Sequence, residues 1–167
     1  TFMPGDDTTA HFRLWNAGLR NAAAGFLEDG GKMIVSGAYV GTDVFKLATD
    51  TLTQNFARET LGYFHRTNHA TTIGQAKFVH PFSGDPGTIH FNDKFSSNIY
   101  KCEAPDAIEP EEDAETFLRY RTNNTSAAVI SRKRGTAVLG FPLETVGNDS
   151  ARSELVRQII RYLQSGE

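Results

Sequence analysis

The chain lacks the features that mark several large classes of protein. It has one cysteine in 167 residues, Cys102, which excludes an internal disulfide and a cluster of thiolate metal ligands. No apolar run approaches the roughly 18 residues that a membrane-spanning helix needs, so we expect no membrane span. The 17 basic and 20 acidic residues nearly balance, giving a net charge of -3. Nothing therefore favours nucleic acid as a partner.

An initiator methionine and a visible signal peptide are also missing, because the chain begins at Thr1. We expect Thr1 to be a processed end or an internal boundary of a larger, multidomain protein. The chain shows no internal repeat, no low-complexity tract and no linker. Its length and its 39% hydrophobic content suit one domain with a real core, so we expect residues 1–167 to form a single domain.

The first third of the chain has a helix–strand–helix pattern. Apolar residues recur at steps of three and four from Thr9 to Glu28, and Gly30 and Gly31 then end that predicted helix. A short apolar strand follows at 32–35, and a second helix is predicted over 44–63. Because the strand is apolar throughout rather than alternating, the pattern favours a parallel sheet covered on both faces. The predicted fold is an α/β three-layer sandwich with a mainly parallel sheet.

The remainder of the chain adds three predicted features. Segments of β character and a strong turn signal form a β-rich insertion from about Thr71 to Tyr100. The stretch 94–110 is expected to be irregular, because prolines break any helix there. A hairpin is predicted from strands 126–132 and 136–141, and a last helix over 150–163.

The glycine-containing bend after the first strand is the most informative local feature. Gly37 and Gly41 flank Tyr39 with the spacing of a nucleophile elbow, a tight turn that presents one side chain at a sheet edge. Thr42 or Asp43 is placed to cap the helix that follows. About a hundred residues later, Phe141-Pro142-Leu143-Glu144 carries a strand into a turn that presents a carboxylate.

Together these two segments resemble the class I glutamine amidotransferase-like, flavodoxin-like domains. That family has Gly-x-Cys-x-Gly at its elbow and a strand that ends in Phe-His-Pro-Glu. The resemblance places the nucleophile at Tyr39, the histidine at Pro142 and the orienting glutamate at Glu144. A phenol with a pKa of about 10 is a poor replacement for a thiolate, and proline transfers no proton. The resemblance thus implies the fold and a degenerate active site.

A closer resemblance is to the amidotransferase-like domain of large secreted Bacteroidetes proteins of the xanthan lyase-like or golvesin-related kind. It is carried by GGKMIVSGAYVGTDV at 30–44, APDAIEP at 104–110, AVLGFPLETV at 137–146 and IIRYL at 159–163. The resemblance implies a secreted or cell-envelope protein, whose neighbouring domains are the partners of this one.

Two functional hypotheses follow. The leading one is a non-catalytic, amidotransferase-like accessory domain that serves binding or assembly, with a glycan or small molecule as ligand. The alternative is a hydrolase or polysaccharide lyase that uses a reorganised site at the same sheet edge, with Tyr39, Asp43 and Glu144 as acid and base groups. A phenol can act in this way if its neighbours lower its pKa. A purely structural spacer is a third hypothesis.

We expect neither a metal nor a cofactor. His65 and His69 have the spacing that places two imidazoles on one helix face, as zinc sites require. They lie, however, where the second helix should already have ended, and no glutamate follows His65. Cys102 is expected to be a small buried residue rather than a nucleophile. Ser36 and Thr42, beside the elbow, are expected to stabilise the turn.

Overall fold

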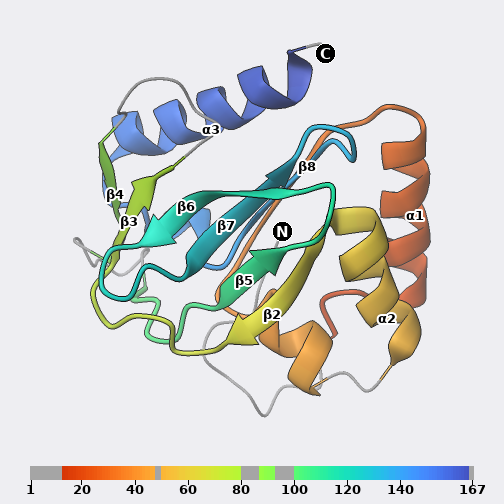
Figure 1. Ribbon diagram of the computed structural model, residues 1–167, viewed down its shortest axis with the longest axis horizontal. Coiled ribbons are helices and arrows are strands. Elements are labelled where there is room, and N and C mark those ends of the chain that lie inside the picture. The colour runs from red at the N-terminus through yellow and green to blue at the C-terminus, as the bar shows by residue number, and fades with distance from the viewer. Residues whose placement is uncertain (1–12, 48–49, 80–86, 93–99, 166–167) are drawn as a thin grey trace.

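The computed structural model describes residues 13–47, 50–79, 87–92 and 100–165 (Figure 1). Its elements, in chain order, are α1 (Ala17–Glu28), β1 (Met33–Ser36), η1 (Asp43–Leu47), α2 (Thr51–Asn55), η2 (Phe56–Leu61), β2 (Tyr63–Thr67), β3 (Gln75–Phe78), β4 (Thr88–His90), β5 (Ala107–Pro110), β6 (Glu115–Tyr120), β7 (Ser126–Ser131), β8 (Thr136–Leu139), η3 (Leu143–Thr145) and α3 (Asp149–Gln164).

The strands form one mixed sheet and one small sheet. Within the described residues, six strands lie in the order β1-β8-β7-β6-β3-β4, and β2 pairs with β5 in a separate two-stranded sheet. Only the β1–β8 pairing is parallel among those described; the others are antiparallel. The domain is therefore β-rich, with a mostly antiparallel sheet. The predicted three-layer α/β sandwich with a mainly parallel sheet is wrong.

The error comes from extending one strand to the whole sheet: β1, from which parallel pairing was inferred, does run parallel to β8, but the other described pairings are antiparallel. Every residue of β7 and of β8 is buried, as in a strand of a parallel sheet, yet these two strands are antiparallel. Gly135, with φ of 70°, provides the left-handed residue of the tight turn that joins them. Burial on both faces shows that a strand is covered on both sides. It does not determine whether the neighbouring strand runs parallel or antiparallel.

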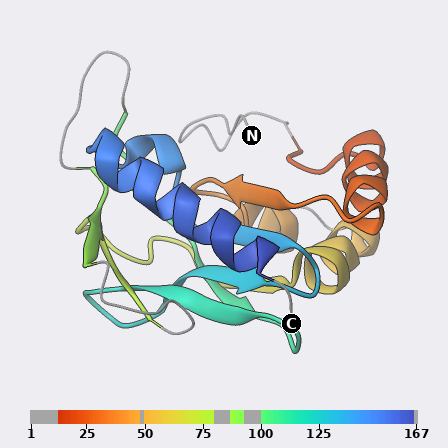
Figure 2. The same cartoon turned by 90° about the horizontal axis from the view of Figure 1, so that it is seen from above.

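Two hydrophobic cores lie on opposite faces of β8. Ala137 and Leu139 belong to the core that also contains Leu155 and Ile159 of α3, whereas Val138 belongs to the other core. That second core contains residues of α1, η2, β2 and β5. Figures 1 and 2 accordingly show α1 beside α2, with α3 apart from them over the sheet. Each fully buried Leu or Ile contributes roughly 1.5–3 kcal/mol.

The predicted second helix over 44–63 is confirmed only in part. It is divided into a π-helical turn (η1), the short helix α2 and a second π-helical segment (η2). Gly62, with φ of 85°, ends η2 in the left-handed conformation, and strand β2 begins at Tyr63. The first helix is confirmed in part: it begins at Ala17, where the Asn16 side chain accepts from the Leu19 amide, and residues 1–12 lie outside the described residues.

The middle of the chain belongs to the sheets. The β-rich stretch contains β3 and β4, and β3 pairs with β6 of the main sheet rather than forming a separate insertion. Residues 80–86 and 93–99 of that stretch lie outside the described residues. In the stretch predicted as irregular, β5 pairs with β2, which lies more than forty residues earlier. The predicted hairpin and last helix are confirmed as β7–β8 and α3.

The expectation of no membrane-spanning helix is confirmed for the described residues, where each helix is too short or too polar to cross a bilayer.

Candidate functional site

The corner, residues 37–43, joins β1 to η1 as a tight turn. The Gly37 amide donates to the Leu139 carbonyl at 3.2 Å, which extends the β1–β8 pairing into the corner. The Asp43 amide then donates to the Tyr39 carbonyl at 2.9 Å and begins a helical turn. The elbow spacing thus predicts the local strand–turn–helix path correctly.

The corner is closed by a carboxylate from the residue before β5. Asp106 is fully buried and Thr42 is 5% exposed. The Asp106 Oδ2 atom accepts from the amides of Gly41 at 2.8 Å and Thr42 at 2.7 Å, while the Thr42 hydroxyl donates to Oδ1 at 2.6 Å. These three donors hold the corner in one conformation.

Two glycines allow this close approach. A Cβ on Gly41 would lie 2.8 Å from Cδ2 of His65 and 3.2 Å from Oδ2 of Asp106, and a Cβ on Gly140 would lie 2.0 Å from the Asp106 carbonyl oxygen. The Asp106 amide also donates to the Gly140 carbonyl at 2.8 Å. The glycines therefore admit a buried imidazole and carboxylate, which is a structural reason for the elbow spacing.

His65 completes what we call the corner cluster: Thr42, His65 and Asp106. The His65 side chain is 3% exposed, and its Nε2 lies 3.8 Å from Oδ1 of Asp106 and 3.4 Å from Oγ1 of Thr42. Burial, with a smaller contribution from Lys46, lowers the pKa of His65. Burial raises the pKa of Asp106 to about 7, against the opposing effect of its bonds to Thr42 and Gly41. At 3.8 Å the two side chains are beyond hydrogen-bond range.

Two buried tyrosines donate hydrogen bonds to backbone carbonyls in the same region. The Tyr120 hydroxyl donates to the Asp106 carbonyl at 2.8 Å, and the Tyr63 hydroxyl donates to the Val40 carbonyl at 2.7 Å. Both backbone carbonyls are thereby satisfied without water, as buried polar groups must be.

The corner cluster contains a hydroxyl, an imidazole and a carboxylate, the groups of a hydrolytic triad. In such a triad the imidazole takes the proton of the nucleophile, and the carboxylate orients the imidazole. Here the Thr42 hydroxyl donates to Asp106 instead of His65. This arrangement braces the corner and does not activate the hydroxyl.

The predicted acid/base residues Tyr39 and Asp43 lie in different surroundings. Tyr39 is half-buried and packs against the core that contains α3. Asp43 is buried, and its Oδ2 accepts from the Leu14 amide at 3.0 Å, with the Arg13 guanidinium 3.9 Å from Oδ1. Burial raises the pKa of Asp43, against the opposing effects of these two neighbours.

Glu144, the third predicted site residue, is exposed in η3 and accepts from the Tyr100 hydroxyl at 3.1 Å. In the described part of the chain, no hydrogen bond or ion pair joins Glu144 to Asp43. The proposed acid/base roles of these residues stay a prediction.

The structure places the histidine pair off any helix. His65 lies in β2, and His69 lies in the following loop with φ of 52°, so their spacing of four does not bring the two rings onto one helical face. No group of three or more His, Cys, Asp or Glu is positioned to hold a metal ion within the residues described. Cys102 is buried, and its backbone is held by the Asn92 side chain through two 2.8 Å hydrogen bonds.

Comparison with known proteins identifies a fold but no family. No family model and no curated protein matches the chain. Its fold is similar to the mmIFT52 N-terminal domain, with a TM-score of 0.55 and 15% identity over 92% of this chain and 73% of that one. It is also similar to part of the cold-adapted β-galactosidase from Rahnella sp. R3, with a TM-score of 0.55 and 13% identity over 85% of this chain. The match spans only 21% of the β-galactosidase chain.

These neighbours correct the resemblance drawn from sequence. With the mostly antiparallel sheet, they overturn the assignment to the class I glutamine amidotransferase-like, flavodoxin-like domains and to the Bacteroidetes xanthan lyase-like or golvesin-related group. The elbow spacing and the Phe-Pro-Leu-Glu turn are short local patterns, and a strand–turn–helix corner occurs in sheets of more than one topology.

Sequence analysis assigned no role to Asp106, the residue on which the corner depends. The available signal was an acidic residue inside the apolar stretch Ala104–Ile108, where a charge is unusual unless it has partners. The identity of those partners could not be read from the sequence, because Gly41 and Thr42 lie more than sixty residues away.

Proposed function

We propose that this chain is a non-catalytic accessory domain that serves binding or assembly within a larger protein. The observation that carries the proposal is the closed corner cluster. Its carboxylate is fully buried and accepts three hydrogen bonds, one of them from the Thr42 hydroxyl, so these polar groups beside the elbow hold the turn.

Catalysis needs groups that a substrate can reach. A general base must come within hydrogen-bond distance of the proton that it removes, about 2.6–3.2 Å. Asp106 and His65 are almost completely shielded from solvent, and Asp106 already accepts the Thr42 proton donor. Opening this cluster to a substrate would leave several buried donors without partners, at roughly 1–3 kcal/mol each.

The structural neighbours support a role as one part of a larger chain. One is itself an N-terminal domain, and the other match is about a fifth of a β-galactosidase. A galactosidase acts on a glycan substrate, which makes glycans the first ligands to test. A secreted or cell-envelope location remains part of the proposal, and fractionation of cells that express the full-length protein would test it.

The alternative is a hydrolase or polysaccharide lyase that uses Tyr39, Asp43 and Glu144. The observation in its favour is the buried carboxyl of Asp43, whose raised pKa is a property of general acids. Against it, Asp43 is engaged by the Leu14 amide, and Glu144 is exposed and bonded to Tyr100.

The experiment separates binding from turnover. The 167-residue chain would be screened against soluble polysaccharides and cell-wall fragments, with affinity electrophoresis for binding and reducing-end release for cleavage. We expect no cleavage, with any signal confined to binding. Cleavage that is lost in Glu144→Gln and kept in the control Glu154→Gln, a part-exposed residue on α3, would establish the enzyme and overturn the proposal. The assembly version would be tested by titrating the chain with the neighbouring domains of its full-length protein.

A further inference from the structure

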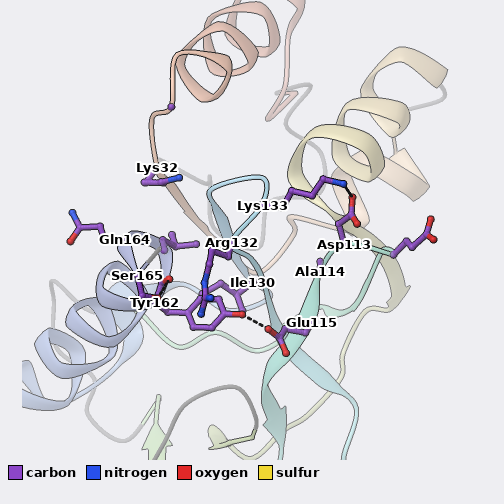
Figure 3. Close-up of a pocket in the computed structure, with 13 residues that line it drawn as sticks. Lys32, Asp113, Ala114, Glu115, Ile130, Arg132, Lys133, Tyr162, Gln164 and Ser165 are labelled. Carbon is purple, nitrogen blue, oxygen red and sulfur yellow. Dashed lines mark hydrogen bonds and ion pairs between the residues drawn. The ribbon is translucent and has the colours of Figure 1, made fainter. Parts of the chain in front are cut away.

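A groove of about 880 Å³ lies at the end of β1 opposite the corner. Its walls come from the residues before β1, the turn between β7 and β8, the start of β6 and the C-terminal end of α3 (Figure 3). The side chains that matter are those of Lys32, Glu115, Arg132, Lys133 and Tyr162.

One wall of the groove is fixed by an aromatic ring and a guanidinium. The Tyr162 hydroxyl donates to the Glu115 carboxylate, and the Arg132 guanidinium lies over the Tyr162 ring at 4.3 Å from its centroid (Figure 3). Burial and the Glu115 carboxylate raise the pKa of Tyr162 to about 12, so the phenol stays a proton donor at neutral pH. These contacts hold the positive charge of Arg132 in a defined place.

The second wall is already neutralised. Asp113 pairs with Lys133 at 2.8 Å and with Arg134 at 3.7 Å, and the hydrogen bond from Lys133 is the main reason that the pKa of Asp113 is lowered. Asp113 therefore neutralises Lys133, whereas Arg134 does not line the groove and donates to the backbone carbonyls of Arg58 and Glu59.

Two cations of the groove have no such partner. Arg132 and Lys32 make no ion pair with any residue in the described ranges. The Nε atom of Arg132 is buried and has no hydrogen-bond partner. A buried donor without an acceptor costs roughly 1–3 kcal/mol, and the Nε atom of the neighbouring Arg134 shares this condition.

We propose that this groove binds a single oxyanion group, a carboxylate or a phosphate, of a small ligand. Arg132 provides the fork of donors that matches a planar oxyanion, and Lys32 adds a point charge on the opposite side. Glu112 and Glu115 also line the groove, so the formal charge of its six ionised side chains, Lys32, Arg132, Lys133, Glu112, Asp113 and Glu115, sums to zero. A long polyanion would be repelled by these carboxylates. A single oxyanion beside Arg132 can bind without contacting them. The proposal does not depend on the proposed function, because the groove shares no residue with the corner cluster.

The test is an NMR titration of the intact chain at constant ionic strength. The probes are sodium phosphate, sodium acetate and sodium glucuronate, with sodium chloride as the reference salt. We expect millimolar binding that shifts the resonances of Arg132, Tyr162 and Lys32. Arg132→Gln should weaken it by about tenfold and Lys32→Gln by about threefold, as for the loss of one charge-assisted contact each. Lys77→Gln, an exposed change on β3, is the matched control and should have no effect.

The arms of the titration separate the sources of the oxyanion. Binding of phosphate alone identifies a phosphorylated ligand, and binding of both acetate and glucuronate identifies a carboxylate. If none of the three anions shifts these resonances, or if Lys77→Gln weakens binding as much as Arg132→Gln, the proposal is wrong. Lys32→Gln changes an exposed side chain, so it keeps the test decisive if Arg132→Gln disturbs packing on Tyr162.

Discussion

The two polar regions at opposite ends of β1, the corner cluster and the groove, differ in whether their polar groups already have partners within the protein. In the corner cluster, Asp106 is buried and every nearby donor is used, so its polar groups hold the backbone. In the groove, Arg132 and Lys32 retain unused donors beside a cavity. The Thr42 hydroxyl and the Asp106 carboxyl thus bond to each other and to the backbone, and the accessible charges lie away from the elbow pattern. Residue type alone does not identify a site; burial and unused hydrogen-bonding capacity do.

The causes of the pKa shifts also differ between the corner cluster and the groove. Burial is the main influence at the corner, where it raises the pKa of Asp106 and lowers that of His65. At the groove, partners contribute more: the hydrogen bond from Lys133 is the main cause of the lowered pKa of Asp113, and the Glu115 carboxylate adds to burial in raising the pKa of Tyr162. Changes at the corner should therefore affect folding, and changes at the groove should affect binding.

The largest effect is expected from Gly140→Ala. The added Cβ would lie 2.0 Å from the Asp106 carbonyl oxygen, and this is a clash with backbone that no side-chain rotation relieves. We expect a loss of about 4 kcal/mol or more in the free energy of unfolding, measured by urea denaturation. Gly25→Ala in α1 is the control: its Cβ has no atom within 4 Å, and the change should be neutral or stabilise by up to about 1 kcal/mol. Equal stability of the two variants would contradict the close approach at the corner.

The next effect is a dependence of stability on pH. The pKa of Asp106 in the folded protein is about 7, above the ordinary value of 3.8, so folding favours the protonated carboxyl. Its contribution is complete below about pH 4 and is lost as the pH rises through about 7. His65 acts in the opposite direction, because its lowered pKa gives a contribution that is present above about 6.5 and lost as the pH falls.

Asp106→Asn should remove the decline that Asp106 causes. We expect the difference in unfolding free energy between this variant and the wild type to change by about 3 kcal/mol between about pH 4 and 8. The measurement is a series of urea denaturation curves, with His65→Gln to separate the opposing contribution. Parallel curves for Asp106→Asn and the wild type would rule out a raised pKa at Asp106.

The smallest expected effect is the difference in stability between two Tyr→Phe variants, one at the corner and one at the groove. Tyr120→Phe removes a fully buried hydroxyl and leaves the Asp106 carbonyl without that donor, at a cost of about 1.5 kcal/mol. Tyr162→Phe removes a part-exposed hydroxyl from the groove, and solvent can replace it, so we expect a cost of about 0.5 kcal/mol. Thermal unfolding of both variants checks the difference. A costlier change at Tyr162 would reverse the contrast between a sealed corner and an open groove.

Sequence patterns predicted those elements whose causes are local. The apolar strand β1, the turn that follows it and the β7–β8 hairpin each depend on side chains and glycines within a few residues. The amphipathic repeat of α3 likewise predicts its helix. The strands β2, β5 and β6 were missed, because β2 and β5 are stabilised by each other across more than forty residues. For such strands, pairing with a segment far away in the chain overrides the local propensity of the residues.

The residues of the corner cluster also differ in how far the sequence predicted their roles. Thr42 was expected to stabilise the turn and His65 was considered only as half of a zinc-binding pair, whereas Asp106 had no predicted role.

By itself, the sequence determined the first and last helices, the local strand–turn–helix path of the corner and the absence of a membrane-spanning run. Only the tertiary structure decided that the sheet is mostly antiparallel, that Asp106 closes the corner and that Arg132 and Lys32 meet at a groove. The physical reason is range: backbone conformation follows from neighbours within a turn or two, whereas burial, strand direction and pKa depend on residues that folding brings together from far apart in the chain.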